Sequence, residues 1–287
     1  MHIRNPIEWG VDQVRHAGMA VERIGAHHRE REAGERPLPT VHRITIADLG
    51  DVLARGIDDF AAFRTDVVFL CMVYPFAGFI LARLVFGYDL LPLLFPLASG
   101  FALIGPVAAI GLYEMSRRRE IGLETSWADA FGVFRAPSFG SIMLFGLLLL
   151  AIFLVWLNVA LAIYDLTLGP EAPQSVASFA RDVFTTDMGW VMIAVGVGIG
   201  FLFAVLVLAI SVVSVPLLLD RDVGLGAAIG TSLRAVTANP GPMAVWGFIV
   251  AAGLVLGSLP LFLGLIVVMP VLGHATWHLY RRVVATE

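Results

Sequence analysis

The chain has no lysine, one cysteine and few charged residues. Charged residues make up 15% of its 287 positions, whereas an ordinary soluble domain carries about a quarter. Because 58% of the residues are hydrophobic, the composition predicts a membrane protein. The single Cys71 excludes an internal disulfide and a thiolate metal cluster. All 19 basic residues are arginine, a usage typical of a GC-rich bacterial genome.

The charges that are present exclude some partners. The net charge of −4 and the scattered arginines do not indicate a nucleic-acid partner. The N-terminus has charges where a secretory signal needs an apolar core, so we expect no cleavage there. Residues 1–43 are predicted to form a cytoplasmic segment that is partly disordered, because residues 26–39 are polar, charged and interrupted by proline.

Long apolar runs predict an all-α membrane helix bundle of six spans, residues 65–283. A helix of about 20 residues crosses the hydrocarbon core. We expect spans at about 66–86, 90–113, 139–164 and 189–218, and two more within the apolar stretch 243–280, divided by a hairpin near 257–260.

The distribution of arginines predicts the orientation of the chain. With both termini in the cytoplasm, seventeen of the nineteen arginines lie inside, and only Arg83 and Arg181 lie outside. This bias follows the positive-inside rule for an even number of spans. We therefore expect a multi-pass protein of the bacterial inner membrane, with "EMSRRRE" as the cytoplasmic end of the second span.

Three helices are expected outside the spans. Residues 44–64 predict an amphipathic interfacial helix, because Thr45 and Asp48 have capping-box spacing and the apolar residues that follow share one face. Short cytoplasmic helices are expected at about 125–134 and 223–238. Both follow a span and precede a proline, which suggests an internal repeat of about 100–157 and 210–260. Shared features of membrane sequences explain the likeness equally well.

Two motifs carry a family resemblance. Residues 53–81 contain an L-x-x-G-x-x-D-F pattern, and residues 101–122 read "FALIGPVAAIGLYEMSRRREIG". Together they resemble the bacterial predicted integral membrane proteins grouped as domain of unknown function 2189. The resemblance implies coverage from about Val41 onward and a membrane fold. It implies no activity, because the family has none established.

The second motif supplies the first candidate site. Glu114 and Arg118 have the favourable i,i+4 order for an ion pair on a helix, and Arg117, Arg118 and Arg119 would meet the anionic inner leaflet. The simpler interpretation is a stop-transfer anchor. In the alternative, Glu114 pins the loop helix and helps to form a surface for a cytoplasmic partner.

Asp59 and two histidines are weaker candidates. Asp59 most simply faces water, with a binding role as the alternative. His274 and His278 share one face of the last helix at i,i+4 spacing, which is compatible with a metal site if ligands come from elsewhere. The neighbouring aromatic and basic residues instead favour the membrane interface, where a histidine needs no special role. We expect no cofactor and no bound metal.

Three functions remain open. No catalytic motif is visible, and no ionisable residue lies near the middle of a span. We therefore expect a non-catalytic accessory, scaffold or assembly partner of an envelope or respiratory complex. Helices interrupted by proline leave a small-solute transporter or channel as the alternative, and a haem or metal redox protein as a third. Small residues at four-residue spacing, such as Gly196 with Gly200, indicate helix packing within one subunit or in a homo-oligomer.

Overall fold

The computed structural model describes residues 38–63, 71–87, 90–136, 138–171 and 173–285. Over these ranges the chain is helical, and no strand is present apart from one isolated bridge. The predicted segment 1–43 therefore lies largely outside the described residues. The helices, in chain order, are α2 (Ile46–Ala62), α4 (Val73–Gly87), η1 (Leu91–Leu93), α5 (Leu94–Ala108), α6 (Ile110–Glu120), η2 (Trp127–Arg135), α7 (Phe139–Thr167), α8 (Val176–Thr185), α9 (Asp187–Ser211), α10 (Ser214–Asp220), α11 (Leu225–Ala238), α12 (Pro240–Ser258) and α13 (Leu265–Val283).

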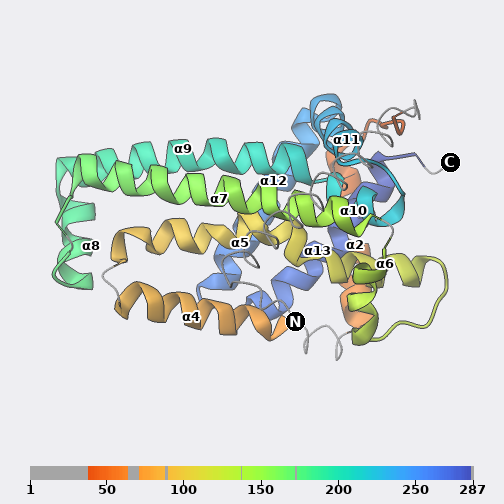
Figure 1. Ribbon diagram of the computed structural model, residues 1–287, viewed down its shortest axis with the longest axis horizontal. Coiled ribbons are helices and arrows are strands. Elements are labelled where there is room, and N and C mark those ends of the chain that lie inside the picture. Colours follow the sequence, from red (N-terminus) through yellow and green to blue (C-terminus); the bar gives the residue numbers. More distant parts are fainter. Residues whose placement is uncertain (1–37, 64–70, 88–89, 137, 172, 286–287) are drawn as a thin grey trace, which may run out of the picture.

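The long helices run side by side, and shorter helices lie at the two ends. α5 contacts α4 and α7, and α7 contacts α9, so these four helices form the body of the molecule (Figure 1). The short α8 lies across one end of the body. The other end, which we call the cap, consists of α2, η2 and α11 with the ends of α6, α10 and α13 that they contact.

Four helical stretches of the described chain are long and apolar enough to cross a bilayer: Leu91–Glu120, Phe139–Thr167, Asp187–Asp220 and Pro240–Ser258. They match four of the six predicted spans, and the count of six is not confirmed. The first residues of the first predicted span, 66–86, lie outside the described residues. The rest of this span corresponds to the 15 residues of α4. The last, α13, has an amphipathic second half that is buried in the cap.

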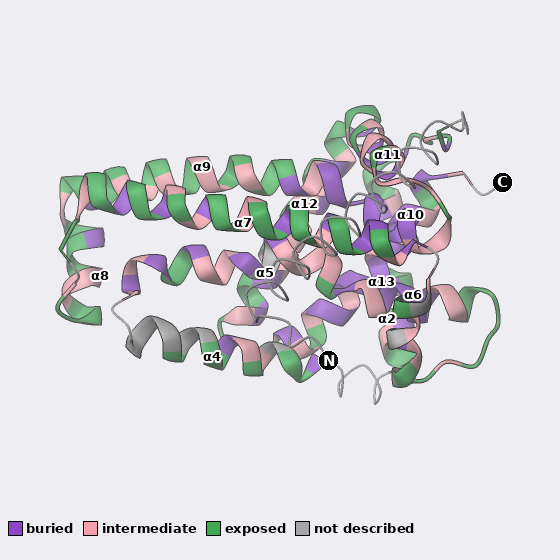
Figure 2. Ribbon diagram, viewed as in Figure 1, coloured by how far each residue is buried: buried purple, intermediate pink, exposed green. Residues whose placement is uncertain are grey.

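Exposure differs sharply between the body and the cap. Few residues are buried along α7 and α9, whereas buried residues concentrate in α10, α13 and the adjoining faces of the cap (Figure 2). The exposed residues of α7 and α9 are large and apolar, as in Leu147, Phe201 and Leu202. Such a surface is suited to lipid, because a helix satisfies its own backbone there.

A side chain from the cap sets the bend between α9 and α10. Pro216 has no N–H and crowds the preceding turn, which interrupts the helix. The Ser232 hydroxyl of α11 donates to the Ala209 carbonyl oxygen at 2.8 Å and accepts from the Val213 N–H at 3.3 Å. The hydroxyl thus takes the place of the direct 213-to-209 hydrogen bond, which is a recognised cause of a kink.

A tight turn divides α12 from α13, as the sequence predicted. The prediction placed it near 257–260, and the helices end at Ser258 and resume at Leu265. Leu261 and Phe262 have positive φ angles of 53° and 64°, which are uncommon for residues other than glycine.

A glycine allows close contact between two helices of the body, α7 and α9. A Cβ atom on Gly200 of α9 would lie 3.1 Å from the Trp156 ring of α7. The Trp156 indole N–H donates to the Ser99 hydroxyl of α5 at 2.9 Å, so one tryptophan joins three helices. The predicted use of small residues for packing within one subunit is therefore confirmed at Gly200. A Cβ on Gly196 would meet nothing within 4 Å.

The amphipathic helix α2 packs on protein through its buried face. Thr45 and Asp48 form the predicted capping box. A Cβ on Gly56 would lie 2.7 Å from the Ala275 Cβ and 2.8 Å from the Val271 carbonyl oxygen of α13. Glycine is therefore required for the two backbones to approach this closely.

The two ends of the described chain are joined. Val41 and Val284 form an isolated antiparallel bridge, with the His42 N–H donating to the Val283 carbonyl oxygen at 2.7 Å. The Asn239 side chain accepts from the Ile44 N–H at 2.7 Å. The segment before α2 is therefore fixed to both α13 and the start of α12.

Helices are present near both predicted loop positions. η2 matches the prediction for 125–134, and α11 matches the prediction for 223–238. One order of elements occurs twice, in α5–α6–η2–α7 and in α9–α10–α11–α12. In both, a long helix breaks near a proline and is followed by a short helix, a loop helix and a further span. The sequence did not predict α8, which begins with a Ser175 cap and buries Val183.

Candidate functional site

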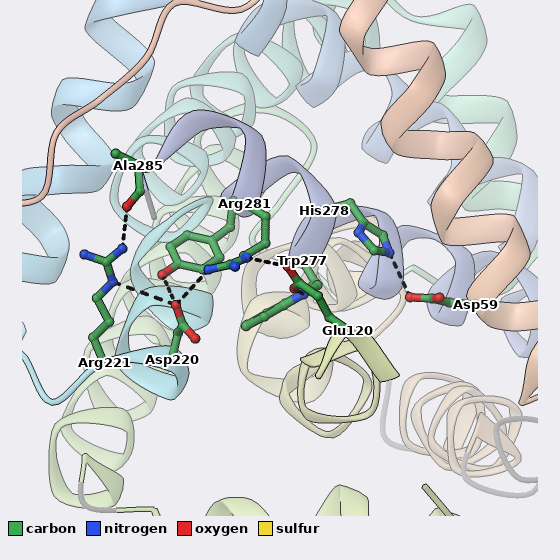
Figure 3. Close-up of polar contacts among 9 residues, drawn as sticks. Asp59, Glu120, Asp220, Arg221, Trp277, His278, Arg281 and Ala285 are labelled. Carbon is green, nitrogen blue, oxygen red and sulfur yellow. Dashed lines mark hydrogen bonds and ion pairs between the residues drawn. The ribbon is translucent and has the colours of Figure 1, made fainter. Parts of the chain in front are cut away.

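The candidate site is a buried polar cluster where α2, α6 and α13 meet. Asp59 of α2 is only 4% exposed. Its Oδ2 atom accepts from the Ser116 hydroxyl at 2.6 Å and from His278 Nε2 at 2.8 Å, and Oδ1 accepts from Arg119. The Ser116 hydroxyl oxygen also lies 2.7 Å from His274 Nδ1. Asp59 thus joins residues of three helices (Figure 3 shows His278 directed at Asp59).

The hydrogen bonds determine which nitrogen of His274 carries a proton. An ionised Asp59 only accepts, so the Ser116 hydroxyl hydrogen is directed at Asp59. The Ser116 oxygen must then accept from His274, which places the proton on Nδ1 and a lone pair on Nε2. His274 is fully buried, and Nε2 has no hydrogen-bond partner.

The surroundings of Asp59 favour its charged form. Burial alone raises the pKa of this carboxyl, but the hydrogen bonds from His278 and Ser116 outweigh burial and hold the pKa below its ordinary value. The Arg119 guanidinium adds an ion pair and lies over the Phe63 ring, 5.9 Å from its centroid. A buried carboxylate with these partners is a stable anchor for α2.

This geometry corrects the prediction that Asp59 most simply faces water. The buried residues Leu49, Val52 and Gly56 recur at helical spacing, and the same spacing places Asp59 on the buried face. Asp58, its neighbour, lies on the opposite face and is exposed. The helical period therefore carried a signal for the burial of Asp59, but its polar partners lie far along the chain. His274 and His278, predicted to need no special role, both belong to the cluster. Ser116 was not predicted, although it lies within "EMSRRRE".

The arginine triplet is used inside the molecule. Arg117 and Arg118 both donate to Glu114, at 2.8 Å and 3.0 Å, and Arg119 donates to Asp59. The predicted Glu114–Arg118 pair is therefore present. Each arginine has a carboxylate partner, so the triplet is not a free cationic surface.

Glu114 supports the loop helix from a buried position. Its side chain is 5% exposed, and Arg118 extends from it to Asp129 of η2 at 2.9 Å. The expectation that Glu114 pins the loop helix fits this arrangement. A direct contact between Glu114 and a partner does not, because the carboxylate is covered.

A second set of contacts fixes the end of α13 on its other side. Glu120 accepts from the Trp277 indole at 3.0 Å and from Arg281 at 2.9 Å. Asp220 of α10 accepts from the Tyr280 hydroxyl at 2.6 Å. It also accepts from Arg281 at 3.4 Å (Figure 3). These pairs leave no signal in the sequence, because each joins residues more than 50 positions apart.

The serine, histidine and aspartate of the cluster are not arranged as a catalytic triad. In a triad, histidine lies between serine and aspartate and takes the serine proton. Here Ser116 lies between His274 and Asp59 and is only 1% exposed. The arrangement therefore holds helices together and offers no accessible nucleophile.

The histidines also face different partners. His274 Nδ1 contacts Ser116, whereas His278 Nε2 contacts Asp59. In the part of the chain that the structure describes, no group of three or more histidine, cysteine, aspartate or glutamate residues is arranged to hold a metal ion.

Comparison with known proteins agrees with the membrane architecture. No curated protein and no solved structure matches the chain. A family model described as "Predicted integral membrane protein (DUF2189)" matches residues 94–220. This confirms the resemblance seen in the sequence, over a shorter range than predicted, since residues 53–81 lie outside the match. The matched residues run from α5 to the end of α10 and so include two of the long apolar helical stretches.

Proposed function

We propose that this integral membrane protein is an accessory or scaffold component of a complex in the bacterial inner membrane, without a reaction of its own. The observation that carries the proposal is the ordered cap. Its charged side chains pair with one another, through Asp59, Glu114, Glu120 and Asp220. A pre-ordered surface costs little conformational entropy when a partner binds.

The cap also exposes large apolar side chains. Ile57 of α2, Ile121 and Leu123 of the loop after α6, and Phe134 of η2 are each more than half exposed. Gly122 between the two loop residues has a φ of 75°. Apolar side chains exposed on an otherwise polar surface mark sites of interaction. We call Ile121 and Leu123 the loop tip and propose that it contacts a protein partner.

The proposal includes six crossings, with α4 and α13 as the first and last, and a cytoplasmic cap. The pairing of Val41 with Val284 supports an even number of crossings, because it keeps both ends of the described chain together. The arginines of α6 and α13 lie at this same end, as the positive-inside rule requires.

Cysteine labelling tests the orientation. The buried Cys71 is first replaced by serine. Ser126→Cys then reports on the cap and Ser175→Cys on the α8 end, since both positions are exposed. In spheroplasts, a membrane-impermeant maleimide should label Ser175→Cys and leave Ser126→Cys unlabelled until the cells are lysed. The reverse pattern would overturn the cytoplasmic assignment.

Affinity purification tests the accessory function. The chromosomally tagged protein is recovered from native membranes in mild detergent and analysed by mass spectrometry against an untagged control. We expect a stoichiometric partner that is lost with Ile121→Ser/Leu123→Ser. The matched control is Leu166→Ser, which changes an 84% exposed residue at the opposite end. Equal recovery of the partner with both variants would remove the loop tip from the proposal.

A transporter is the alternative, favoured by the interrupted helices. α5 and α6 are separated at Ala109 after Pro106, and α9 and α10 at Val212 and Val213. Discontinuous helices form the sites of many transporters. Solute flux in proteoliposomes, together with recovery of the protein without a partner, would favour this function over the accessory one.

A further inference from the structure

A histidine with one unsatisfied nitrogen lies within the contact among α2, α6 and α13. His274 is fully buried and its Nε2 has no hydrogen-bond partner, whereas almost all buried polar atoms have one. Nδ1 is already engaged with Ser116 at 2.7 Å. The neutral imidazole is tolerated because Nε2 carries only a lone pair.

We propose that His274 is a proton-controlled latch, which holds α2 against α6 and α13 while neutral and releases α2 when Nε2 takes up a proton. The proton would create a buried N–H without an acceptor and a buried positive charge, both of which are costly. The least costly relief is separation of α2, which admits water to the site. The inference is independent of the proposed function, because it concerns the molecule alone.

Around His274, the negative charge of Asp59 favours a second positive charge and Arg119 opposes it, so burial is the main cost of protonation in the closed state. Arg119 of α6 and His278 of α13 both contact Asp59, the one carboxylate of α2 within the cluster. Both oxygens of Asp59 are already occupied by these residues and Ser116. Protonation of His278 would strengthen its own contact with Asp59. A proton on His278 therefore strengthens the contact with α2, whereas a proton on His274 weakens it.

Other charged groups near α13 are already paired or remote. Glu120 of α6 bonds to Trp277 and Arg281, and Asp220 of α10 bonds to Tyr280 and Arg281. α12 has no titratable side chain, and Arg83 of α4 is exposed. Near the far end of α2, Arg282 bonds to Asp48. These groups leave Asp59 as the acid nearest the histidines.

Histidines and the two aspartates Asp48 and Asp59 of α2 titrate in different pH ranges. A histidine ordinarily titrates near about 6.5. The pKa values of Asp48 and Asp59 are both below the ordinary value, so these residues remain ionised at pH 5. A change from pH 7.5 to 5.0 therefore tests protonation of histidine while Asp48 and Asp59 keep their charge.

Hydrogen exchange measures the release directly. The full-length protein is placed in nanodiscs of phosphatidylcholine and phosphatidylglycerol and followed by mass spectrometry at both pH values, with exchange corrected for its intrinsic pH dependence. We expect amides of α2 to exchange about tenfold or more faster at pH 5.0, whereas amides of α12 keep their protection. Equal protection of α2 at both pH values would overturn the proposal.

Two matched variants assign the effect to one histidine. His274→Gln cannot take up the proton, so its α2 should stay protected at pH 5.0. His278→Gln keeps an N–H donor for Asp59 and should respond to acid as the wild type does. The proposal fails if His274→Gln still responds or if His278→Gln abolishes the response. If His274→Gln does not fold, the test rests on the wild type and His278→Gln. The proposal then fails if α2 of the wild type stays protected at pH 5.0 or if His278→Gln abolishes the response.

Discussion

The cap and the body of the molecule are stabilised by different interactions. In the cap, carboxylates such as Asp59 and Asp220 join helices through buried hydrogen bonds and ion pairs. In the body, Trp156 packs against Gly200 and donates one hydrogen bond, to the Ser99 hydroxyl, without a charged partner. Lipid is as apolar as leucine, so burial between helices gains little there. Polar pairing in the cap therefore determines how the ends of the spans are fixed.

The largest expected effect comes from removing the central carboxylate of the cap. Asp59→Ala leaves Ser116, His278 and Arg119 without their acceptor. Breaking a buried pair by removing one partner costs roughly 3 to 5 kcal/mol. Thermal unfolding in detergent should show a clear fall in Tm. Asp58→Ala is the control, because Asp58 is exposed, and a surface change of this kind is usually worth about 0.5 kcal/mol or less.

The contact between α2 and α13 should be nearly as sensitive to a single methyl group. In Gly56→Ala the new Cβ would meet backbone atoms of α13 at 2.8 Å, so the helices must separate. Overpacking typically costs about 1 to 3 kcal/mol. Gly50→Ala is the control on the same helix. Its Cβ meets nothing within 4 Å, so higher helix propensity should leave stability unchanged or slightly raised. Similar losses in both variants would contradict the tight contact.

Acid should weaken the outer edge of the cap only at low pH. The Thr45 backbone N–H, Arg282 and the Thr45 hydroxyl lower the pKa of Asp48 to about 2, compared with about 3.9 in an unfolded chain. The contribution of Asp48 is therefore complete above about pH 4 and is lost as pH falls towards about 2.

Arg282→Gln removes one of these partners and should flatten the dependence of Tm on pH over that window. The loss of Tm at neutral pH should be smaller than that of Gly56→Ala, because this pair is exposed to solvent. Arg55→Gln is the control, since Arg55 is an exposed arginine of α2. An unchanged pH dependence in Arg282→Gln would exclude this ion pair as the cause.

The smallest effect is expected on the lipid-facing surface of the body. Phe201 of α9 is 64% exposed, so Phe201→Leu exchanges one apolar contact with lipid for another. Unfolding in detergent should change by about 0.5 kcal/mol or less. Phe145→Leu, at a fully buried position of α7, should lower Tm more. A large loss for Phe201→Leu would indicate that this surface is covered by protein.

The sequence predicts those features that depend on neighbouring residues. Apolar length located four spans, the Thr45–Asp48 spacing located the start of α2, and the i,i+4 rule found the Glu114–Arg118 pair. These signals are local in the chain. They also separated α12 from α13 within a few residues of the observed turn.

The cluster around Asp59 could not be predicted in this way. His278 lies 219 positions from Asp59, and the spacing that places Asp59 on the buried face of α2 does not identify the partners packed against it. The same applies to Ser232, whose hydroxyl serves a bend in another helix. α8 was missed because its ten residues are too short and too polar to resemble a span.

The contact between α2 and α13 also has a consequence for the order of synthesis. α2 leaves the ribosome early, but the residues that cover Gly56, and the His278 that contacts Asp59, belong to α13, which is made much later. Until then, Asp59 has only its partners on α6, and the face of α2 that packs on α13 stays uncovered at the membrane surface. A chain that stops before His278 never receives these partners. Loss of the final helix would therefore leave an unpaired helix at the beginning of the chain, which quality-control proteases can recognise.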